Sequence, residues 1–258
     1  LLPAIEAALQ ADQSAVIQLV TTSEALLSRR LADLDPADRA ELALDLSPRE
    51  LVMDYLEAAF PTRAMEIISD DDGNERSRPR SDVDGNPVHS EEALQIRADS
   101  LELLGAMPPI APALDAVIER FGTDAVAEVT GRTKRLIRLP DGSQKLQSRS
   151  PSACMADADA FMNGAKRILV FSDAGGTGRS YHASLDHQNQ QRRVHFLLEP
   201  GWRADRAVQG LGRTNRTNQA QPPIFRPVTT DCRGERRFIS TIARRLDALG
   251  ALTRGQRQ

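Results

Sequence analysis

An apolar strand that runs directly into a glycine-rich turn constrains this chain more than any other feature. Residues 168–171 read Ile-Leu-Val-Phe, and residues 172–178 read Ser-Asp-Ala-Gly-Gly-Thr-Gly. Glycines let the backbone approach an anion closely and point its amide N–H groups at it. In open α/β sheets, ligand sites lie at the carboxyl ends of the strands. The feature therefore predicts an α/β fold with a phosphate-sized site at this turn, or a tight turn that binds no ligand.

Strands alternate with helices along most of the remaining sequence. Predicted strands, each a short apolar run, cover residues 14–20, 124–129, 168–171, 194–198 and 224–228. Predicted helices include residues 113–121, 156–163 and 235–249, and another helix that begins at residue 203. Because parallel strands need a crossover connection, usually a helix, this order predicts a mostly parallel sheet that helices cover on both faces. A hairpin is also predicted at residues 134–148, around Pro140-Asp141-Gly142.

A segment rich in Asp, Gly, Asn, Arg and Pro, from residue 69 to residue 90, interrupts this order. It holds two turn signals, Asp72-Gly73-Asn74 and Asp84-Gly85-Asn86, and neither satisfies the full pattern of a calcium loop. We interpret it as a hairpin within an insertion that also carries helices. The expected organisation is therefore residues 1–34 as the start of the sheet domain, residues 35–111 as the insertion, and residues 112–258 as the remainder.

Charge is distributed unevenly along the chain. The net charge of -3 argues against a generally basic nucleic-acid-binding surface. From Gly201 onward, however, there are 12 arginines, no lysine and four acidic residues, a net charge of +8, while the preceding residues carry -11. This asymmetry indicates either a face for a polyanion near the C-terminus or solvated helix faces.

Composition also bears on location. The sequence has no run of about 18 apolar residues that could span a membrane. Its two cysteines, Cys154 and Cys232, are far apart and have no metal-ligand spacing, so reduced thiols in a cytoplasmic protein are expected. The start, Leu1-Leu2-Pro3, has neither a methionine nor a basic region, which suggests a piece of a longer protein.

A segment between residues 203 and 216 is the second candidate site. If it is helical throughout, Gln209, Arg213 and Arg216 lie together on the face opposite its apolar stripe. Two guanidinium groups on one face suit recognition of phosphate oxygens. A solvated basic face is the alternative, and it explains the arginines but not Gln209.

Other parts of a nucleotide site are missing. The sequence has no Gly-x4-Gly-Lys-Ser/Thr loop and no Asp-Glu pair that ends an apolar strand, so this chain by itself is not expected to hold Mg-ATP in the usual way. A dinucleotide-binding unit is a rival interpretation, because Glu199 ends the next strand where a ribose ligand would lie. Against it, Tyr181 stands in place of the third glycine and Asp173 lies within the turn.

Together these segments resemble the second RecA-like lobe of superfamily 2 helicases, with motif V at Ser172–Ser180 and motif VI, Gln-x-x-Gly-Arg-x-x-Arg, at Gln209–Arg216. The sequence is similar in more detail to the strawberry notch family. The similar segments are Val16–Ala25, Phe121–Arg132, Arg192–His195, Trp202–Ala207, Gly212–Gln219 and Arg245–Thr253. It departs from the family at Asn215, where histidine is common, and at Gly210-Leu211, where a bulkier pair is common.

The resemblance implies a RecA-like three-layer α/β sandwich that serves as the C-terminal lobe of an ATP-dependent nucleic-acid helicase or translocase. Arg213 and Arg216 would act as arginine fingers on the γ-phosphoryl group. Residues that would contact or sense the nucleotide are Gln209, Asp173, Gly176 and Gly178. Residues that would hold a nucleic-acid backbone are Thr21, Thr22, Thr130, Gly131, Arg132 and Thr177.

Partners follow from the same resemblance. ATP and Mg²⁺ would be held mainly by a first RecA-like lobe of the same parent protein, and the nucleic acid would be DNA in preference to RNA. Alone, this chain would be inactive as an ATPase, and it would bind neither a metal nor a membrane. A helicase-like regulatory or protein-interaction module without catalytic use is the alternative, followed by a dinucleotide-binding domain.

Overall fold

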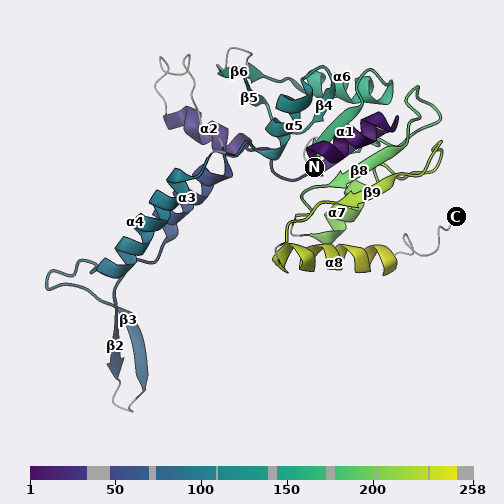
Figure 1. Cartoon of the computed structure of the whole chain (residues 1–258). Coiled ribbons are helices and arrows are strands. Elements are labelled where there is room, and N and C mark those ends of the chain that lie inside the picture. Colours follow the sequence, from purple (N-terminus) through teal and green to yellow (C-terminus); the bar gives the residue numbers. More distant parts are fainter. Residues whose placement is uncertain are drawn as a thin grey trace. The chain divides into compact units, whose positions relative to one another are not determined.

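The chain divides into two units. The computed structural model describes residues 1–33, 47–69, 74–108, 110–138, 144–172, 178–201, 203–231 and 233–248. The first unit joins Leu1–Ala43 to Ala113–Gln258, and the second is Leu44–Pro112. The second unit overlaps residues 35–111, where the sequence predicts an insertion. Figure 1 labels the elements of both.

A five-stranded parallel sheet forms the centre of the first unit (Figure 1). Every neighbouring pair of strands is parallel, and the spatial order is β4-β7-β1-β8-β9. The strands are β1 (Ser14–Leu19), β4 (Val126–Val129), β7 (Ile168–Ser172), β8 (Arg193–Leu197) and β9 (Ile224–Pro227). All five were predicted from the sequence, with bounds that differ by no more than two residues.

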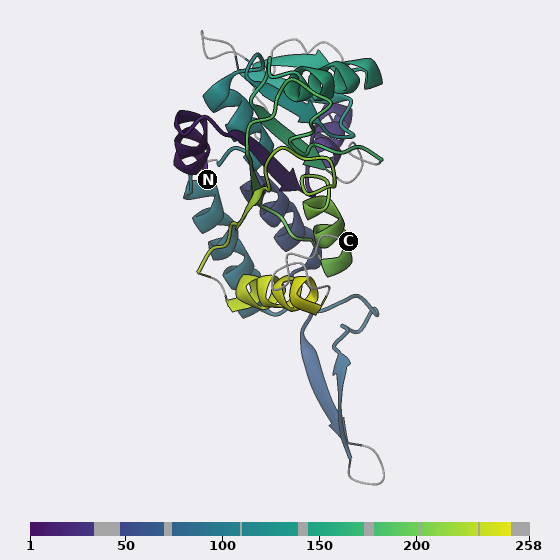
Figure 2. The same ribbon diagram turned by 90° about the vertical axis from the view of Figure 1, so that its right-hand side faces the viewer.

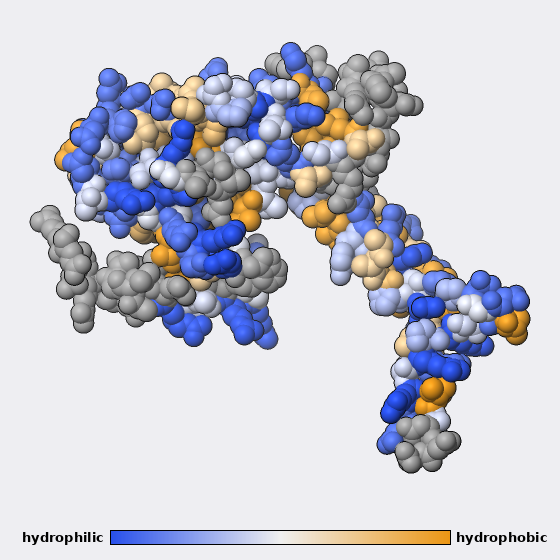
Figure 3. Space-filling view, turned by 180° about the vertical axis from the view of Figure 1, so that it is seen from behind, coloured by the Kyte–Doolittle hydropathy of each residue, from blue (hydrophilic) through white to orange (hydrophobic). Residues whose placement is uncertain are grey.

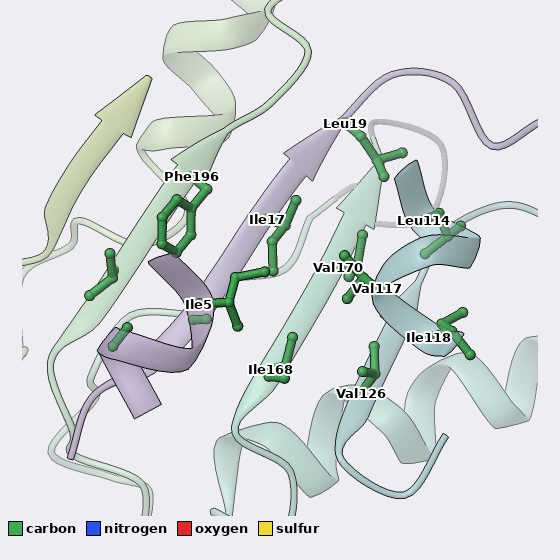
Figure 4. Close-up of a cluster of buried hydrophobic side chains, with 13 residues drawn as sticks. Ile5, Ile17, Leu19, Leu114, Val117, Ile118, Val126, Ile168, Val170 and Phe196 are labelled. Carbon is green, nitrogen blue, oxygen red and sulfur yellow. The ribbon is translucent and has the colours of Figure 1, made fainter. Parts of the chain in front are cut away.

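One face of the sheet is covered by α1 (Leu2–Gln10) and α5 (Ala113–Phe121). Alternate residues of a strand point to opposite faces, so Ile168 and Val170 of β7 contribute to this face. Ile5 of α1 and Leu114 of α5 pack against them in one buried cluster, which Figure 4 shows in close-up. The burial of these apolar residues explains why the two short helices form where they do.

The opposite face is covered by α6 (Pro151–Met162), α7 (Ala204–Leu211) and α8 (Arg233–Ala248). Leu169 and Phe171 of β7 point to this face and pack with Phe161 of α6. Leu197 of β8 packs with the α7 and α8 side chains. The helix α2 (Glu24–Asp33) follows β1. Two helical layers around a parallel sheet confirm the predicted RecA-like α/β sandwich.

Two shorter sheets complete the strand inventory of the described residues. In the first unit, β5 (Lys134–Arg138) pairs antiparallel with β6 (Gln144–Ser148), which confirms the hairpin predicted there. In the second unit, β2 (Met65–Ser69) pairs antiparallel with β3 (Glu75–Pro79). The second unit also contains α3 (Pro48–Ala59) and α4 (Glu91–Ala106), which pack on each other, and the Ser90 hydroxyl caps α4 by accepting a hydrogen bond from the Ala93 amide.

The second unit exposes several large apolar side chains among its polar ones. No residue of α3 or α4 is fully buried. Its exposed large apolar side chains include Leu51 and Tyr55 of α3, Ile67 of β2 and Leu103 of α4, and Figure 3 shows such side chains at its surface. Among the described helices of the whole chain, none is long and apolar enough to cross a membrane.

Candidate nucleotide and nucleic-acid site

Three predicted site segments meet at one edge of the sheet. β4, β7 and β1 are parallel neighbours, so their carboxyl ends lie side by side. Thr21 and Thr22 follow β1, Thr130 and Gly131 follow β4, and the glycine turn follows β7. Three residues of that turn for which roles are predicted lie outside the described residues: Asp173, Gly176 and Thr177. This edge is where a strand-end ligand site of an α/β sheet would lie.

Glu199 holds the segment after β1. Its Oε2 accepts hydrogen bonds from the backbone amides of Val20, at 2.8 Å, and Thr21, at 2.6 Å, and from the Thr21 hydroxyl at 2.5 Å. Three donors therefore converge on one carboxylate oxygen and fix the direction in which the chain leaves β1. The carboxylate that the dinucleotide interpretation needs for a ribose is engaged with the protein itself.

The segment after β4 is anchored by a buried ionic network around Glu128. This glutamate is fully buried within β4, and its Oε1 accepts hydrogen bonds from the Thr130 hydroxyl at 2.9 Å and from Arg132 Nε at 2.6 Å. Arg132 Nη1 donates to Asp115 Oδ1 of α5 at 2.7 Å. Burial opposes the charge of Glu128, but Arg132 and Arg149 nearby outweigh it and lower the pKa of Glu128 below its usual value.

Arg132 is one of the residues that the resemblance assigns to the nucleic-acid backbone. In the structure only 3% of its side chain is exposed, and its guanidinium is paired with two carboxylates. A charged residue in an apolar strand must find a partner of opposite sign, and Arg132 supplies it for Glu128. Thr130 is also buried and bonded to Glu128, which leaves exposed Gly131 as the accessible residue of this segment.

The same network fixes both ends of the β5–β6 hairpin. Arg135 of β5 donates from Nη1 to Glu128 Oε2 at 2.9 Å. Arg149, just after β6, donates from Nη2 to the Glu128 carbonyl at 2.8 Å and to Asp157 Oδ2 of α6 at 3.0 Å. Lys166 Nζ donates to the other oxygen of Asp157 at 2.7 Å. One buried carboxylate thus determines the positions of the Thr130 segment and of the hairpin.

The motif VI helix ends before both of the motif's arginines. α7 ends at Leu211, with Gly212 as its C-terminal cap, and residues 212–214 form a turn. The Thr214 hydroxyl donates to the Leu211 carbonyl at 3.1 Å, and the Thr214 amide donates to the same carbonyl at 3.2 Å. These bonds close the helix, so the helical face expected to unite Gln209, Arg213 and Arg216 does not form.

Arg213 lies against the end of β7. Its Nη1 donates to the carbonyl oxygen of Arg179 at 3.0 Å, and its guanidinium carbon lies 5.8 Å from the centre of the Phe171 ring. The Arg213 carbonyl accepts a hydrogen bond from the Tyr181 amide at 2.7 Å. Arg213 is therefore joined to the chain on the far side of the glycine turn, where Gly178 adopts a φ of 78° that favours glycine. Its buried Nε has no partner among the described residues.

Gln209 and Arg216 are placed differently. Both side chains are exposed, Gln209 on α7 and Arg216 beyond the turn. The Arg216 amide donates to Gln219 Oε1 at 3.2 Å, which orders the backbone after motif VI. The structure thus brings Arg213 to the glycine turn and leaves Gln209 and Arg216 on the surface.

His195 is a residue of the site that sequence reasoning missed. It lies fully buried in β8, and its ring centre is 5.7 Å from that of Phe171 and 5.8 Å from that of Phe225. Its Nδ1 lies 2.8 Å from the Thr214 hydroxyl oxygen. Because that hydroxyl donates to Leu211, Nδ1 carries the proton and donates to Thr214. The histidine thereby joins the sheet to the motif VI turn.

Arg193 is a second residue that was missed. It is fully buried in β8 and donates to the carbonyls of Tyr181 at 2.9 Å, Gln191 at 2.7 Å and Asn189 at 2.7 Å. Burial lowers its pKa to about 10, so it remains charged at neutral pH. It fixes the connection between the glycine turn and β8. Two long polar residues at alternate positions of an otherwise apolar strand were the signal that could have identified both Arg193 and His195.

Lowering the pH from 7 to 4 should destabilise the chain through His195. Burial lowers the pKa of His195 to about 3, whereas an unfolded histidine takes up a proton below about pH 6.5. The unfolded state therefore binds more protons in this window, and the free energy of unfolding should fall by about 1.4 kcal/mol per pH unit from this group. Urea titrations at several pH values measure the slope. In His195→Asn the slope should fall by the equivalent of about one bound proton, and in His182→Asn it should fall much less. Equal slopes in the wild type and His195→Asn would contradict this prediction.

Gly210→Ala should lower the free energy of unfolding by about 1–3 kcal/mol. A Cβ on Gly210 would lie 2.1 Å from Nε2 of Gln18, which is buried on β1. Removing that group in the double variant with Gln18→Ala should make the total loss smaller than the sum of the two single losses. Gly212→Ala, whose nearest atom would lie 3.4 Å away, is the matched control. If the stability losses of the two single variants, measured by urea denaturation, simply add in the double variant, the new Cβ and the Gln18 side chain do not clash, and the prediction is wrong.

The described residues contain no group of three His, Cys, Asp or Glu side chains that could hold a metal ion. With Thr21, Thr130 and Arg132 engaged by carboxylates, this edge offers the exposed backbone at Gly131 and, beside the glycine turn, the Arg213 guanidinium. Such groups bind anions, and arginine in particular binds phosphate oxygens through two parallel hydrogen bonds. The chemistry of this edge is therefore suited to phosphate groups.

Several known proteins are similar to this chain. Residues 112–258 match a family model described as the C-terminal domain on Strawberry notch homologue. Protein strawberry notch of Drosophila melanogaster is 40% identical over 188 residues, 70% of this chain and 11% of that protein. Protein strawberry notch homolog 2 of Homo sapiens is 41% identical over 167 residues, 62% of this chain and 12% of that protein.

Protein FORGETTER 1 of Arabidopsis thaliana is 40% identical over 176 residues, 65% of this chain and 14% of that protein. The chain thus spans less than a sixth of the length of these relatives. No solved structure matches it. Because the family model covers more than half of the chain, including the glycine turn and the motif VI segment, the chain belongs to the strawberry notch family and carries its C-terminal helicase domain.

Proposed function

We propose that this chain is the second RecA-like lobe of an ATP-dependent helicase or translocase that acts on nucleic acid. A first lobe of the same parent protein would hold ATP and Mg²⁺, and closure of the two lobes would bring motif VI to the γ-phosphate. The observation that carries the proposal is the contact between Arg213 and the chain on either side of the glycine turn. It links the motif that would touch the nucleotide to the edge that would touch the nucleic acid.

The arginines would stabilise the charge that develops as the γ-phosphoryl group is transferred. Arg216 is exposed and would reach the phosphate directly. Arg213 would do so after its guanidinium leaves the Arg179 carbonyl, and its unpartnered Nε would then gain a hydrogen-bond acceptor. An arginine finger of this kind is typically worth about 10³ to 10⁵ in rate. Gln209 would report the presence of the nucleotide from the exposed face of α7.

The nucleic-acid backbone would lie along the ends of β1, β4 and β7. Thr22 and Gly131 would offer backbone amides and a hydroxyl there, and such groups contact phosphates without reading sequence. Thr21, whose amide and hydroxyl donate to Glu199, would hold this segment in position. The Glu128 network would hold the β4 end rigid rather than contact the phosphates. Opening and closing of the cleft between the lobes would convert ATP hydrolysis into movement along the strand.

Arg216→Ala in the protein that carries both lobes tests this proposal against its alternative, a regulatory or interaction module without catalytic use. Loss of DNA-stimulated ATP hydrolysis supports the arginine finger. Unchanged hydrolysis supports the regulatory module, an interpretation favoured by the way Arg213 bonds to its own lobe. The exposed Arg120, which pairs with Glu6 on the surface, provides the control variant Arg120→Ala.

The dinucleotide-binding alternative has its own test. Titration of this chain with NAD should give no saturable binding, because Glu199 is occupied by the β1 segment and Tyr181 replaces the third glycine. Saturable binding at micromolar NAD would overturn the assignment of the glycine turn to a helicase lobe.

A further inference from the structure

The outer face of α8 carries a straight row of arginines. α8 packs on α7 through Ile239 and Ile242, which belong to the same apolar cluster as Leu197. At about 100° per residue, Arg233, Arg237 and Arg244 lie on the side opposite these isoleucines. All three arginines are exposed, and Figure 2 shows α8 at the margin of the first unit. The packing of the helix therefore directs its arginines away from the core.

Two carboxylates at the start of α8 are engaged away from this row. Glu235 accepts hydrogen bonds from the amide and the hydroxyl of Thr230 at the start of the helix, with its Oε2 at 2.5 and 2.8 Å. Asp231 is paired with Arg236. In the part of the chain that the structure describes, no carboxylate forms an ion pair with Arg233, Arg237 or Arg244. Among the side chains that the structure describes, the row therefore has no neutralising partner, and Asp247, three residues after Arg244 on the same helix, is an acidic residue of the same outer face.

The space between the arginines is open. Ser240 and Thr241 occupy the same outer face between Arg237 and Arg244, and their hydroxyls are turned back to helix carbonyls at 2.8 and 3.0 Å. Small side chains there leave room for an elongated ligand to approach the helix. With a rise of 1.5 Å per residue, Arg233 and Arg244 are about 16 Å apart along the axis, the length of several nucleotides of a backbone.

We propose that the row formed by Arg233, Arg237 and Arg244 is a second contact surface for a nucleic-acid backbone. It rests on the proposed function, and it extends the nucleic-acid contact beyond the strand ends to the outer helix. An arginine fork binds two phosphate oxygens at once. Between Arg237 and Arg244 the described side chains of this face, Ser240 and Thr241, are small and polar, which suits a phosphate backbone better than the apolar core of a protein interface. Binding there is therefore electrostatic and independent of sequence.

The test is binding of this chain to a fluorescein-labelled 20-residue oligothymidine, followed by fluorescence anisotropy between 50 and 200 mM salt. The triple variant Arg233→Gln, Arg237→Gln, Arg244→Gln should bind at least 10-fold more weakly. The slope of log K against log salt should fall by about 2, since each single-strand phosphate contact contributes about 0.7. The matched control removes three exposed arginines of the second unit, through Arg63→Gln, Arg76→Gln and Arg80→Gln, and should leave the slope unchanged.

The possible outcomes distinguish a failure of the arginine row from a failure of the proposed function. If the α8 variant binds oligothymidine with unchanged affinity and an unchanged slope, the row is not a contact surface. If the variant binds more weakly but still binds, the contact at the strand ends is retained. If the wild-type chain binds poly-glutamate as tightly as oligothymidine and both depend on the row, the partner is an acidic protein and the nucleic-acid assignment fails. A wild-type chain that binds no oligothymidine also overturns the row, whereas the arginine fingers are judged separately by ATP hydrolysis in the protein that carries both lobes.

Discussion

Glu128→Gln should lower the free energy of unfolding by about 3–5 kcal/mol, the usual cost of breaking a buried ion pair by removing one partner. Arg132 and Arg135 are almost fully buried and both donate to this carboxylate. Glutamine keeps the shape but not the charge, so the two guanidinium groups would remain in the interior with one fewer anion. Urea denaturation at pH 7 measures the loss. Asp124→Asn, an exposed acid just before β4, is the control and should change stability by less than about 0.5 kcal/mol.

A second variant shows whether the charge itself is responsible. Combining Glu128→Gln with Arg132→Gln removes both members of the closest pair, and the double variant should lose clearly less than the sum of the two single losses. The contribution of Glu128 should also depend on pH. Because the folded state lowers the pKa of Glu128, its stabilisation is present above the ordinary value of 4.5 and is lost as the pH falls through the folded value. A loss below about 1 kcal/mol would contradict a central role of the network.

Arg213→Ala should reduce kcat for ATP hydrolysis by about 10³-fold or more in the protein that carries both lobes. The side chain is the part that would reach the γ-phosphate, whereas the hydrogen bond that orders the turn runs from the Tyr181 amide to the Arg213 carbonyl and survives the substitution. Affinity for ATP should change little, because the first lobe would hold most of the nucleotide.

Arg213→Lys provides the sharper comparison. Lysine keeps the charge but lacks the planar fork, so most of the lost kcat should not return. The fold of the variants is verified by an unchanged thermal midpoint. A decrease in kcat of less than about 3-fold for Arg213→Ala would remove Arg213 from the catalytic machinery.

Much of the first unit could be predicted from the sequence because its signals are local. Short apolar runs separated by helices specify the strands, and Pro140-Asp141-Gly142 between two β-prone segments specifies the β5–β6 hairpin. The glycine turn and the arginine segment identified the family, since these motifs are local as well. These predictions needed no knowledge of which side chains meet in space.

What could not be predicted has long-range causes. A helix through the whole motif VI segment would continue to Arg216, but a hydrogen bond from His195 of β8 stabilises the turn that follows Leu211, where α7 ends. The burial of Arg132 depends on Glu128, which lies within an apolar strand and requires a buried partner of opposite charge. A glutamate at a buried strand position is the local signal of such a pairing.

The most direct test of the central claim is a comparison of DNA-stimulated ATP hydrolysis by this chain, by the first lobe of the family, and by the two joined in one protein. The account predicts no turnover by either lobe alone and turnover by the joined protein that Arg213→Ala together with Arg216→Ala abolishes. Hydrolysis by this chain alone, or by the joined protein irrespective of both arginines, would contradict it.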